Sequence, residues 1–410
     1  MSKTALVLGG GGAKGSYQTG VLEALKDLKI NYDIVTGASV GSINGAIAVT
    51  GKIGLSKKLW KTLTVKNILD LDEKSEKADL KGVIENGGYS TNNLKRLLNK
   101  YIDEDEIRGS HIEYGLVTVK YPEMIPVYKF TEDIEKGRLV DYILGSSAFF
   151  PAMRPYEIAG QFYIDGGFTD NLPVNMAIKK GADNIIAVDL KAIGVIKRAK
   201  DKNVKITRIS PARDLGEILD FNPQRAKINM KLGYLDTLKA LSSYEGFYYT
   251  FKSKEISDFL KKTKSLKPLK AFSRAYQKAF IKALELSYIT ETKSSIKPSG
   301  RDLYIYILEY LMSLSSLPEF EIYKLKKAHI LIKRSFKQVE TEGIYSLKEN
   351  PSHFIKNISE IIKSIDKKTL IKLIYENLDL VKGDNSIINL LALTAPKELL
   401  SAHYLRYLYN

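Results

Sequence analysis

Residues 37–41, Gly-Ala-Ser-Val-Gly, have the spacing G-x-S-x-G and stand between a predicted strand, Tyr32–Thr36, and a predicted helix, Ser39–Val49. In a nucleophile elbow, the tight turn pushes the serine hydroxyl out of the sheet, and the glycines remove side chains that would collide. The partial positive charge at the start of the helix would stabilise an incipient oxyanion. An ordinary glycine-rich turn, in which Ser39 only caps the helix, fits the same residues, so the motif alone leaves both hypotheses open.

A glycine run at residues 9–15, Gly-Gly-Gly-Gly-Ala-Lys-Gly, follows a predicted strand at Thr4–Leu8. Its backbone N–H groups could converge on a phosphate or on the oxyanion of an acyl transfer. A dinucleotide fold requires an acid at the end of the second strand, whereas Asp33 stands at its start. A P-loop requires Gly-Lys-Ser/Thr, and the order here is Lys14-Gly15-Ser16. The oxyanion hypothesis is favoured because the next strand supplies a serine, and parallel neighbours would bring both loops to one sheet edge.

A serine nucleophile needs a base, and the chain has four histidines: His111, His329, His353 and His403. Three of them lie in the C-terminal part, where the apolar stripe around His329 predicts a packed side chain. A carboxylate in a dry site can replace histidine. Asp165 is the candidate, since it ends a predicted strand and two glycines follow it, although Asp-Gly is also a common hairpin turn.

The elements around these motifs alternate as strand, helix, strand, helix, which favours an α/β sheet with helices on its faces. The predicted helices include Ser16–Lys29, Asn92–Tyr101 and Val174–Lys180, whereas residues 52–90 are Lys-rich and poorly patterned. Further strands are predicted at Tyr114–Lys120, Ile125–Phe130, Phe162–Ile164, Ile185–Leu190 and Val204–Ile209.

After about residue 225 only helical patterns recur, and we place a domain boundary near residue 250. Two apolar stripes predict helices there: Phe354, Ile358, Ile361, Ile362 and Ile365, and Ile322, Leu325, His329, Ile332 and Phe336. Residues 261–270 and 292–300 are candidate linkers, rich in Lys, Ser and Pro. The domains expected are therefore 1–250 and 251–410, the second being helical and Lys-rich.

Composition narrows the chemistry further. The chain has 410 residues and a net charge of +16. It has no Cys, and this absence excludes disulfides and thiolate nucleophiles. Residues 1–250 carry a net charge of +5 and residues 251–410 one of +11, so most of the excess lies in the C-terminal part. No signal peptide and no membrane-spanning run are expected, which predicts a cytoplasmic or peripheral membrane protein.

Together the motifs resemble the patatin-like phospholipases. The resemblance covers residues 3–250 and rests on the glycine run, the serine motif and residues 165–167, Asp-Gly-Gly, in that order. Residues 146–151 upstream of Asp165 and residues 171–174 downstream support it. It implies a three-layer α/β sheet with flanking helices, followed here by an all-α C-terminal domain.

The resemblance also implies roles for individual residues. Ser39 would be the nucleophile and Asp165 the general base, without a catalytic histidine. The oxyanion hole would be built from Gly10, Gly11 and Gly12, with Gly11 and Gly12 the favoured donors. The remaining motif positions are Lys14, Gly15, Gly37, Gly41, Gly166 and Gly167. Leu8 and Gly9 stand where many members carry an acid.

The activity implied is hydrolysis of acyl esters in a phospholipid or lysophospholipid, of the phospholipase A or lysophospholipase type, with no cofactor and no metal. An acyltransferase that uses the same acyl-enzyme is the main alternative, and a catalytically inactive lipid-binding module is a third hypothesis. The basic C-terminal helices could contact an anionic membrane through Lys324, Lys326, Lys327, Lys333 and Arg334, or simply keep the surface solvated. The absence of a recognisable nucleic-acid-binding motif disfavours nucleic acid as a partner.

Overall fold

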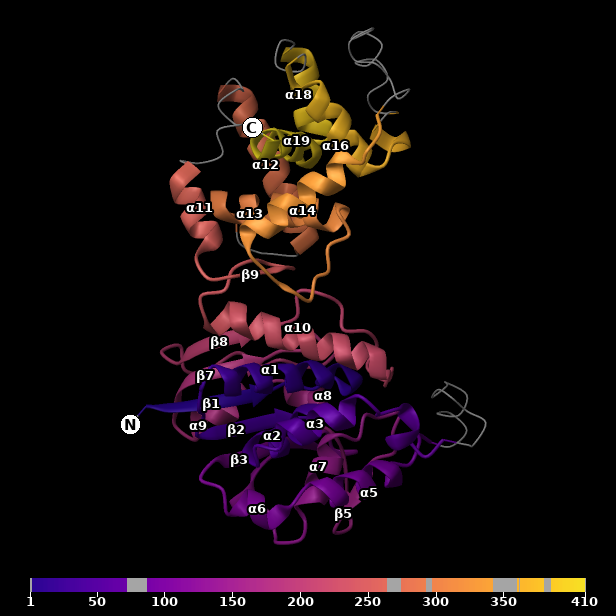
Figure 1. The fold of residues 1–410 in the computed structure, drawn as a ribbon. Helices are drawn as coiled ribbons and strands as arrows, with labels where there is room; N and C mark the ends of the chain where they lie inside the picture. Colours follow the sequence, from indigo (N-terminus) through magenta and orange to yellow (C-terminus); the bar gives the residue numbers. More distant parts are fainter. Residues whose placement is uncertain are drawn as a thin grey trace. The chain divides into compact units, whose positions relative to one another are not determined.

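The computed structural model describes residues 2–71, 87–263, 274–292, 297–341, 360, 362–379 and 385–409 (Figure 1). The chain forms two compact units, Met1–Ser242 and Ser243–Asn410. Residues 243–250, which the sequence placed with the N-terminal domain, belong to the second unit.

The first unit is built on one mixed sheet of eight strands, in the order β5-β6-β3-β2-β1-β7-β8 with β4 paired to β3. Strands β1, β2, β3, β7 and β8 run parallel, whereas β4 and β6 run antiparallel to β3 and β5 antiparallel to β6. The strands are β1 (Lys3–Leu8), β2 (Ile34–Ala38), β3 (Glu113–Tyr121), β4 (Ile125–Phe130), β5 (Tyr156–Ile158), β6 (Gln161–Asp165), β7 (Ala182–Val188) and β8 (Lys205–Ile209). All seven predicted strands are present, and the short β5 was not predicted. The α/β fold class is confirmed.

Helices cover both faces of this sheet. Ala5 and Val7 of β1 pack in a cluster with residues of α9 on one face, and the alternate residues Leu6 and Leu8 are equally buried on the other. Helices α1 and α10 lie side by side along the sheet (Figure 1). The helices are α1 (Ser16–Asp27), α2 (Val40–Val49), α3 (Ile53–Trp60), α5 (Asn92–Tyr101), α6 (Glu104–Arg108), α7 (Leu139–Ser146), α8 (Gly167–Asp170), α9 (Val174–Lys179) and α10 (Pro223–Leu241), with short 3₁₀ turns at Gly12–Gly15, Val65–Asn67 and Thr131–Asp133.

Two local predictions need correction. The glycine run was expected to be a loop throughout, but Gly12–Gly15 forms a 3₁₀ turn that leads directly into α1. The poorly patterned stretch 52–90 contains α3 and the turn Val65–Asn67, because Ile53 and Trp60 are buried while the lysines between them stay on the surface. Residues 72–86 of that stretch lie outside the described residues.

Strand β3 brings the ends of two other strands together along one of its edges. Residues 113–117 of β3 pair with β2 in parallel, and residues 118–121 pair with β6 in the antiparallel sense. Because β4 pairs with residues 115–120, it must occupy the opposite edge. Strands β2 and β6 therefore run toward each other and end on neighbouring residues, Ala38 opposite Val117 and Asp165 opposite Thr118.

The second unit is helical around a large apolar core. Its helices are α11 (Glu255–Thr263), α12 (Arg274–Thr292), α13 (Gly300–Leu314), α14 (Leu325–Lys337), α16 (Lys367–Glu376), α18 (Asn385–Thr394) and α19 (Pro396–Tyr409). The expected helical C-terminal domain is confirmed, and in addition β9 (Thr250–Phe251) and β10 (Ile322–Tyr323) pair in parallel. This pairing joins segments more than 70 residues apart, so no local pattern could indicate it.

The helical stripes and linkers of this unit were predicted in part. Leu325, Ile332 and Phe336 form the buried face of α14, as predicted, but Ile322 precedes the helix and is exposed in β10. In the other stripe, Phe354, Ile358 and Ile361 lie outside the described residues, and Ile362 and Ile365 pack on the core. Both expected linkers overlap helices at their ends, because α11 continues to Thr263, α12 continues to Thr292 and α13 begins at Gly300. Residues 264–270 and 293–296 are not described.

Helices α1 and α10 touch backbone to backbone, which gives a test of the fold. A Cβ at Gly20 would lie 1.8 Å from the Met230 carbonyl oxygen, whereas a Cβ at Gly54 in α3 would meet nothing within 4 Å. We expect Gly20→Ala to lower the free energy of unfolding by at least about 1–3 kcal/mol, because the helices must move apart. The matched variant Gly54→Ala should be neutral or slightly stabilising. Thermal unfolding of the two variants measures the difference, and equal melting temperatures would contradict the predicted close packing.

Candidate active site

Ser39 occupies a strained turn between β2 and α2. Its backbone angles are φ 54° and ψ −131°, an unfavourable conformation for a residue with a side chain, and it is 8% exposed. The turn is closed so tightly that a Cβ at Gly41 would lie 2.1 Å from the Leu8 carbonyl oxygen, and one at Gly37 would lie 2.3 Å from the Gly41 carbonyl oxygen. The G-x-S-x-G spacing therefore forms an elbow, as predicted, because only glycine fits at both flanking positions.

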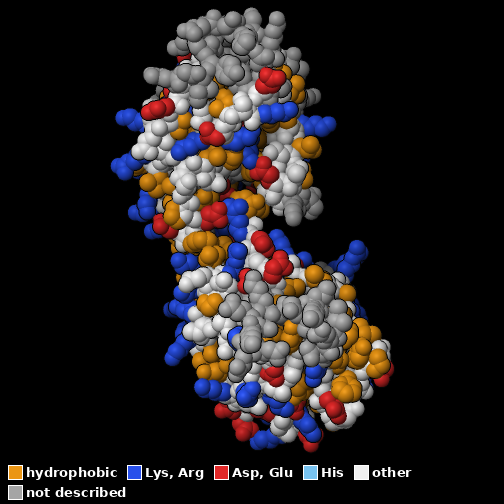
Figure 2. Space-filling view, turned by 90° about the vertical axis from the view of Figure 1, so that its right-hand side faces the viewer, with side chains coloured by type: hydrophobic (Ala, Val, Ile, Leu, Met, Phe, Trp, Pro, Cys, Tyr) orange, Lys and Arg blue, Asp and Glu red, His pale blue; other side chains and the backbone are white. Residues whose placement is uncertain are grey.

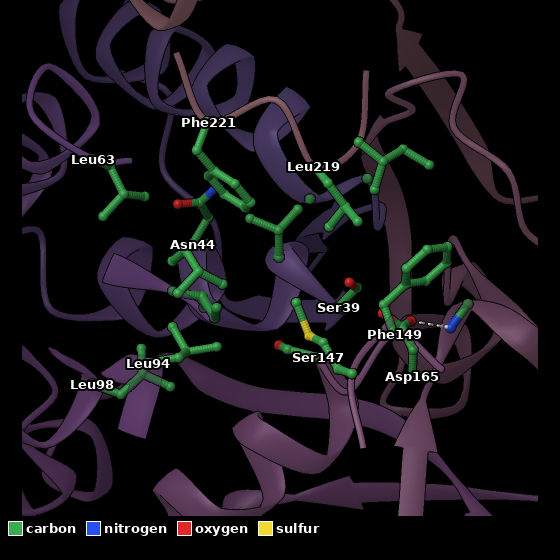
Figure 3. Close-up of a pocket in the computed structure, with 18 of the residues that line it drawn as sticks. Ser39, Asn44, Leu63, Leu94, Leu98, Ser147, Phe149, Asp165, Leu219 and Phe221 are labelled. Carbon is green, nitrogen blue, oxygen red and sulfur yellow. Dashed lines mark hydrogen bonds between the residues drawn. The ribbon is translucent and has the colours of Figure 1, made fainter. Parts of the chain in front are cut away.

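Asp165 ends β6 and lies beside Ser39 in a buried position, 3% exposed (Figure 3). One carboxylate oxygen, Oδ1, accepts a hydrogen bond of 2.7 Å from the Gly167 N–H. Burial raises the pKa of Asp165 to about 6, against the opposing effects of hydrogen bonds from the Ser39 hydroxyl and the Gly167 N–H. The chain continues into α8 instead of a hairpin, so the alternative of a simple Asp-Gly turn is excluded.

Residues 146–148 fix the two converging strand ends. The Ser146 hydroxyl donates to the Val117 carbonyl oxygen at 2.7 Å and accepts from the Ser39 N–H at 3.0 Å. The Ser146 carbonyl accepts from the Gly166 N–H at 3.2 Å, and the Ala148 carbonyl accepts from the Asp165 N–H at 2.9 Å. The sequence identified this segment only as support for a resemblance. Its contact with Ser39 spans 107 residues along the chain, so its positioning role could not be derived from local pattern.

The glycine run has fewer available donors than expected. The Gly10 N–H donates to the Asn171 carbonyl oxygen at 3.1 Å, so the assignment of Gly10 to an oxyanion hole is corrected. Gly11 and Gly12 line the same cavity as Ser39, and their N–H groups have no partner among the residues that the structure describes. Gly12 adopts φ 53°, and a Cβ there would lie 2.2 Å from the Ile218 carbonyl oxygen.

The other motif residues support the site, and among them only Gly167 lines the cavity. Lys14 belongs to the 3₁₀ turn and does not line the cavity. A Cβ at Gly15 would lie 2.4 Å from Val40 Cγ2, and one at Gly166 would lie 2.2 Å from the Val117 carbonyl oxygen. Gly167 supplies the N–H that Asp165 accepts and lines the cavity.

The cavity beside Ser39 has a volume of about 150 Å³ and is lined mainly by hydrophobic side chains. Among the lining residues labelled in Figure 3, Ser39 and Asp165 lie on one side of the group, and Leu94, Leu98 and Leu63 lie on the opposite side. Further apolar lining comes from Leu59, Trp60 and Phe221. Such a pocket excludes water from the carboxylate and suits a linear apolar ligand.

None of the described histidines takes part in this site. His111 is exposed just before β3 and does not line the cavity. His329 packs in the second unit, where its Nε2 hydrogen-bonds the Tyr404 hydroxyl at 2.7 Å and burial lowers its pKa to about 4. His403 lies on α19 of the same unit, and His353 is not described. Within the described ranges, no three His, Asp or Glu residues are grouped as metal ligands would be.

The elbow, the buried carboxylate and the glycine turn all border the same cavity. Residues 6–178 match the family model described as patatin-like phospholipase, and we identify this part of the chain as a patatin-like phospholipase domain.

Curated relatives match part of the chain. Patatin-like phospholipase domain-containing protein 7 of Rattus norvegicus is 29% identical over 194 residues, which is 45% of this chain and 13% of that protein. Lysophospholipase NTE1 of Saccharomyces cerevisiae is 26% identical over 262 residues, 58% of this chain and 14% of that protein. The chain thus spans about an eighth of the length of these relatives.

Among solved structures, VipD from Legionella pneumophila has 13% sequence identity and a TM-score of 0.41, with 100% of this chain and 92% of that chain covered. No helix within the described ranges is long and apolar enough to cross a membrane.

The raised pKa of Asp165 predicts a pH-dependent cost in stability. The folded carboxyl holds its proton more tightly than the unfolded one, so the folded state loses stability as the pH rises from about 4 to about 6. Asp165→Asn removes this loss, and we expect the variant to gain on the order of 1–3 kcal/mol over the wild type at pH 8 and little at pH 4. Denaturant unfolding at both pH values measures the gain. The exposed Asp105, whose pKa is lowered by Lys136, provides the control variant Asp105→Asn, for which no such gain is expected.

Proposed function

We propose that the protein is a serine lipid acyl hydrolase of the phospholipase A or lysophospholipase type. The observation that carries the proposal is Ser39 in a strained elbow, next to a buried Asp165, at the end of an apolar cavity. Residues 6–178 match the patatin-like phospholipase family model, and the curated relatives bear phospholipase and lysophospholipase names, which agrees with a lipid ester as substrate.

In the proposed mechanism, the Asp165 carboxylate removes the proton from the Ser39 hydroxyl as its oxygen attacks the ester carbonyl carbon. The N–H groups of Gly11 and Gly12 then stabilise the tetrahedral oxyanion. The C–O bond to the alcohol breaks as Asp165 returns the proton to the leaving oxygen, and an acyl-enzyme remains. Water, deprotonated in turn by Asp165, attacks this ester and releases the fatty acid with Ser39 restored.

An acyltransferase would share the first half of this sequence and differ only in the acceptor. Product analysis by mass spectrometry with and without added glycerol or lysophospholipid separates the two activities. An inactive lipid-binding module is the third hypothesis, which the intact pair Ser39 and Asp165 disfavours.

We also propose a peripheral contact between the second unit and an anionic membrane. The cations expected for this role lie on or next to α14, where Lys324, Lys326, Lys327 and Arg334 are exposed. The Lys327 Nζ lies 3.6 Å from the Glu321 Oε2, and the Lys333 Nζ lies 5.1 Å from the centroid of the Tyr409 ring. Part of this positive charge therefore already interacts with groups of the protein itself.

Loss of either member of the pair should abolish ester hydrolysis. We expect Ser39→Ala and Asp165→Asn to lower fatty acid release from a mixed lipid extract by about 10²-fold to 10⁴-fold. The first variant loses the nucleophile, and the second loses the base that accepts its proton. A fluorophosphonate probe should label the wild type and not Ser39→Ala. Ser147→Ala is the matched control, since its hydroxyl also faces the cavity region but donates to the Ile143 carbonyl oxygen, and this variant should still be labelled. Near-normal activity of Asp165→Asn would contradict the dyad.

The pH profile gives an independent test of the base. Only the ionised carboxylate can accept the serine proton, and the pKa of Asp165 is raised to about 6. We therefore expect kcat/KM on a soluble p-nitrophenyl ester to rise about tenfold per pH unit below pH 6 and to level off above it. An acid limb with a midpoint near 4, the ordinary value for a carboxyl group, would show that a different group or an unperturbed carboxylate limits the reaction.

A further inference from the structure

The segment that follows β7, residues 191–200, is an unusual stretch of surface that the proposed mechanism does not use. We call it the rim loop. Its sequence is Lys-Ala-Ile-Gly-Val-Ile-Lys-Arg-Ala-Lys, with three branched apolar side chains at its centre. Ile193 is 82% exposed, Val195 49% and Ile196 38%. Single exposed apolar residues are common on protein surfaces, but three within four residues indicate a site of interaction.

The rim loop is held in place at the mouth of the cavity. The Val195 N–H donates to the Gly167 carbonyl oxygen at 2.9 Å, and the Val195 carbonyl accepts from the Asn171 N–H at 2.6 Å. Both partners lie on the segment that immediately follows Asp165. The Asn175 side chain holds the far end, since it donates to the Arg198 carbonyl and accepts from the Lys200 N–H, each at 2.8 Å. The apolar side chains are therefore exposed by a fixed backbone.

The rim loop is also continuous with the apolar lining of the site. Ile193 and Gly194 line the cavity that contains Ser39 and Asp165, together with Phe168 of α8. Phe168 is itself 36% exposed, so it extends the apolar surface from the loop toward Asp165. A ligand that covered the rim loop would lie next to the open end of the cavity.

The charges around these side chains identify the kind of partner. The rim loop carries four cations, Lys191, Lys197, Arg198 and Lys200, all exposed, and no acid. The Lys197 ammonium donates to the Tyr128 hydroxyl at 2.7 Å, which fixes one cation beside the loop. Figure 2 shows hydrophobic, basic and acidic side chains intermingled on the visible face of this unit, whereas the rim loop itself has no acidic residue. An apolar centre with a cationic border matches acyl chains beneath anionic phosphates, as at a lipid surface.

We propose that the rim loop is the site at which the patatin-like unit inserts into an anionic lipid surface. Ile193, Val195 and Ile196 enter the acyl region, and Lys197, Arg198 and Lys200 contact lipid phosphates, whereas the Lys191 ammonium donates to the Pro211 carbonyl oxygen at 2.9 Å. An acyl chain passes along Ile193 and Phe168 into the cavity without crossing water. The inference extends the proposed function, because it names the physical state of the substrate as a lipid within a membrane. It places a membrane contact on the first unit, in addition to any contact made by α14.

The test measures membrane binding separately from catalysis. The full chain carrying Ser39→Ala is sedimented with vesicles of phosphatidylcholine alone and with vesicles containing one quarter phosphatidylglycerol. In this background Val195→Asn with Ile196→Asn should weaken binding to both vesicles at least tenfold. Arg198→Gln with Lys200→Gln should reduce the preference for the anionic vesicles severalfold. Ile206→Asn in β8, another exposed isoleucine (36%) that does not line the cavity, is the control and should bind normally.

Several results would overturn the inference. One is that the parent protein binds neither vesicle, and another is that the Val195→Asn, Ile196→Asn variant binds as the parent does with an unchanged melting temperature. Loss of binding in Ile330→Asn on α14, with none in the rim-loop variant, would assign docking to the second unit alone. Failure of the proposed function is seen separately, as absence of ester hydrolysis by the protein with Ser39 intact, and leaves the binding result valid.

Discussion

The pairing of two consecutive residues of β3 determines most of the geometry described above. Val117 lies opposite Ala38 and Thr118 lies opposite Asp165, so β2 and β6 end head to head on the same edge. Neither strand could be longer by even one paired residue without displacing the other. The backbone must therefore leave the sheet sharply at both ends, which places Ser39 in an unfavourable conformation and brings Gly166 against the Val117 carbonyl. Ser146 occupies the junction and satisfies the polar groups that the interrupted pairing leaves without partners.

Burial in an apolar pocket has two consequences that cannot be separated. The hydrophobic side chains that suit an acyl chain also remove water from Asp165, and this desolvation is the main cause of its raised pKa. A carboxylate in water is too weak a base to assist a serine effectively, whereas one in a dry pocket is stronger. Because the ionised form of Asp165 is less stable in that pocket than in water, the greater basicity of the carboxylate comes with a lower stability of the folded protein. The hydrogen bond from Gly167 limits this loss and fixes the orientation of the carboxylate.

The sequence predicted those features that are determined locally or by alternation. Seven strands, the elbow at Ser39 and the helix Asn92–Tyr101 follow from glycine spacing and apolar periodicity over a few residues. Asp165 was selected because it ends a strand and because the motifs in order resemble a family, not because any spacing linked it to Ser39. Gly10 was assigned wrongly as a donor, since its N–H is taken by the carbonyl of Asn171, which lies 161 residues away. The pairing of β9 with β10, the role of Ser146 and the exposure of Ile193 likewise depend on contacts between distant segments, which a single sequence does not reveal.

The separation of Ser39 and Asp165 along the chain also affects when the site can exist during synthesis. The serine elbow and the glycine turn belong to the first 41 residues, whereas the carboxylate arrives 126 residues after the serine and reaches it only when β6 pairs with β3. At typical translation rates that interval lasts roughly 6–25 s. Throughout it, the growing chain holds the serine without its partner. In the proposed mechanism, such a chain cannot hydrolyse an ester until β6 has been translated and has paired with β3.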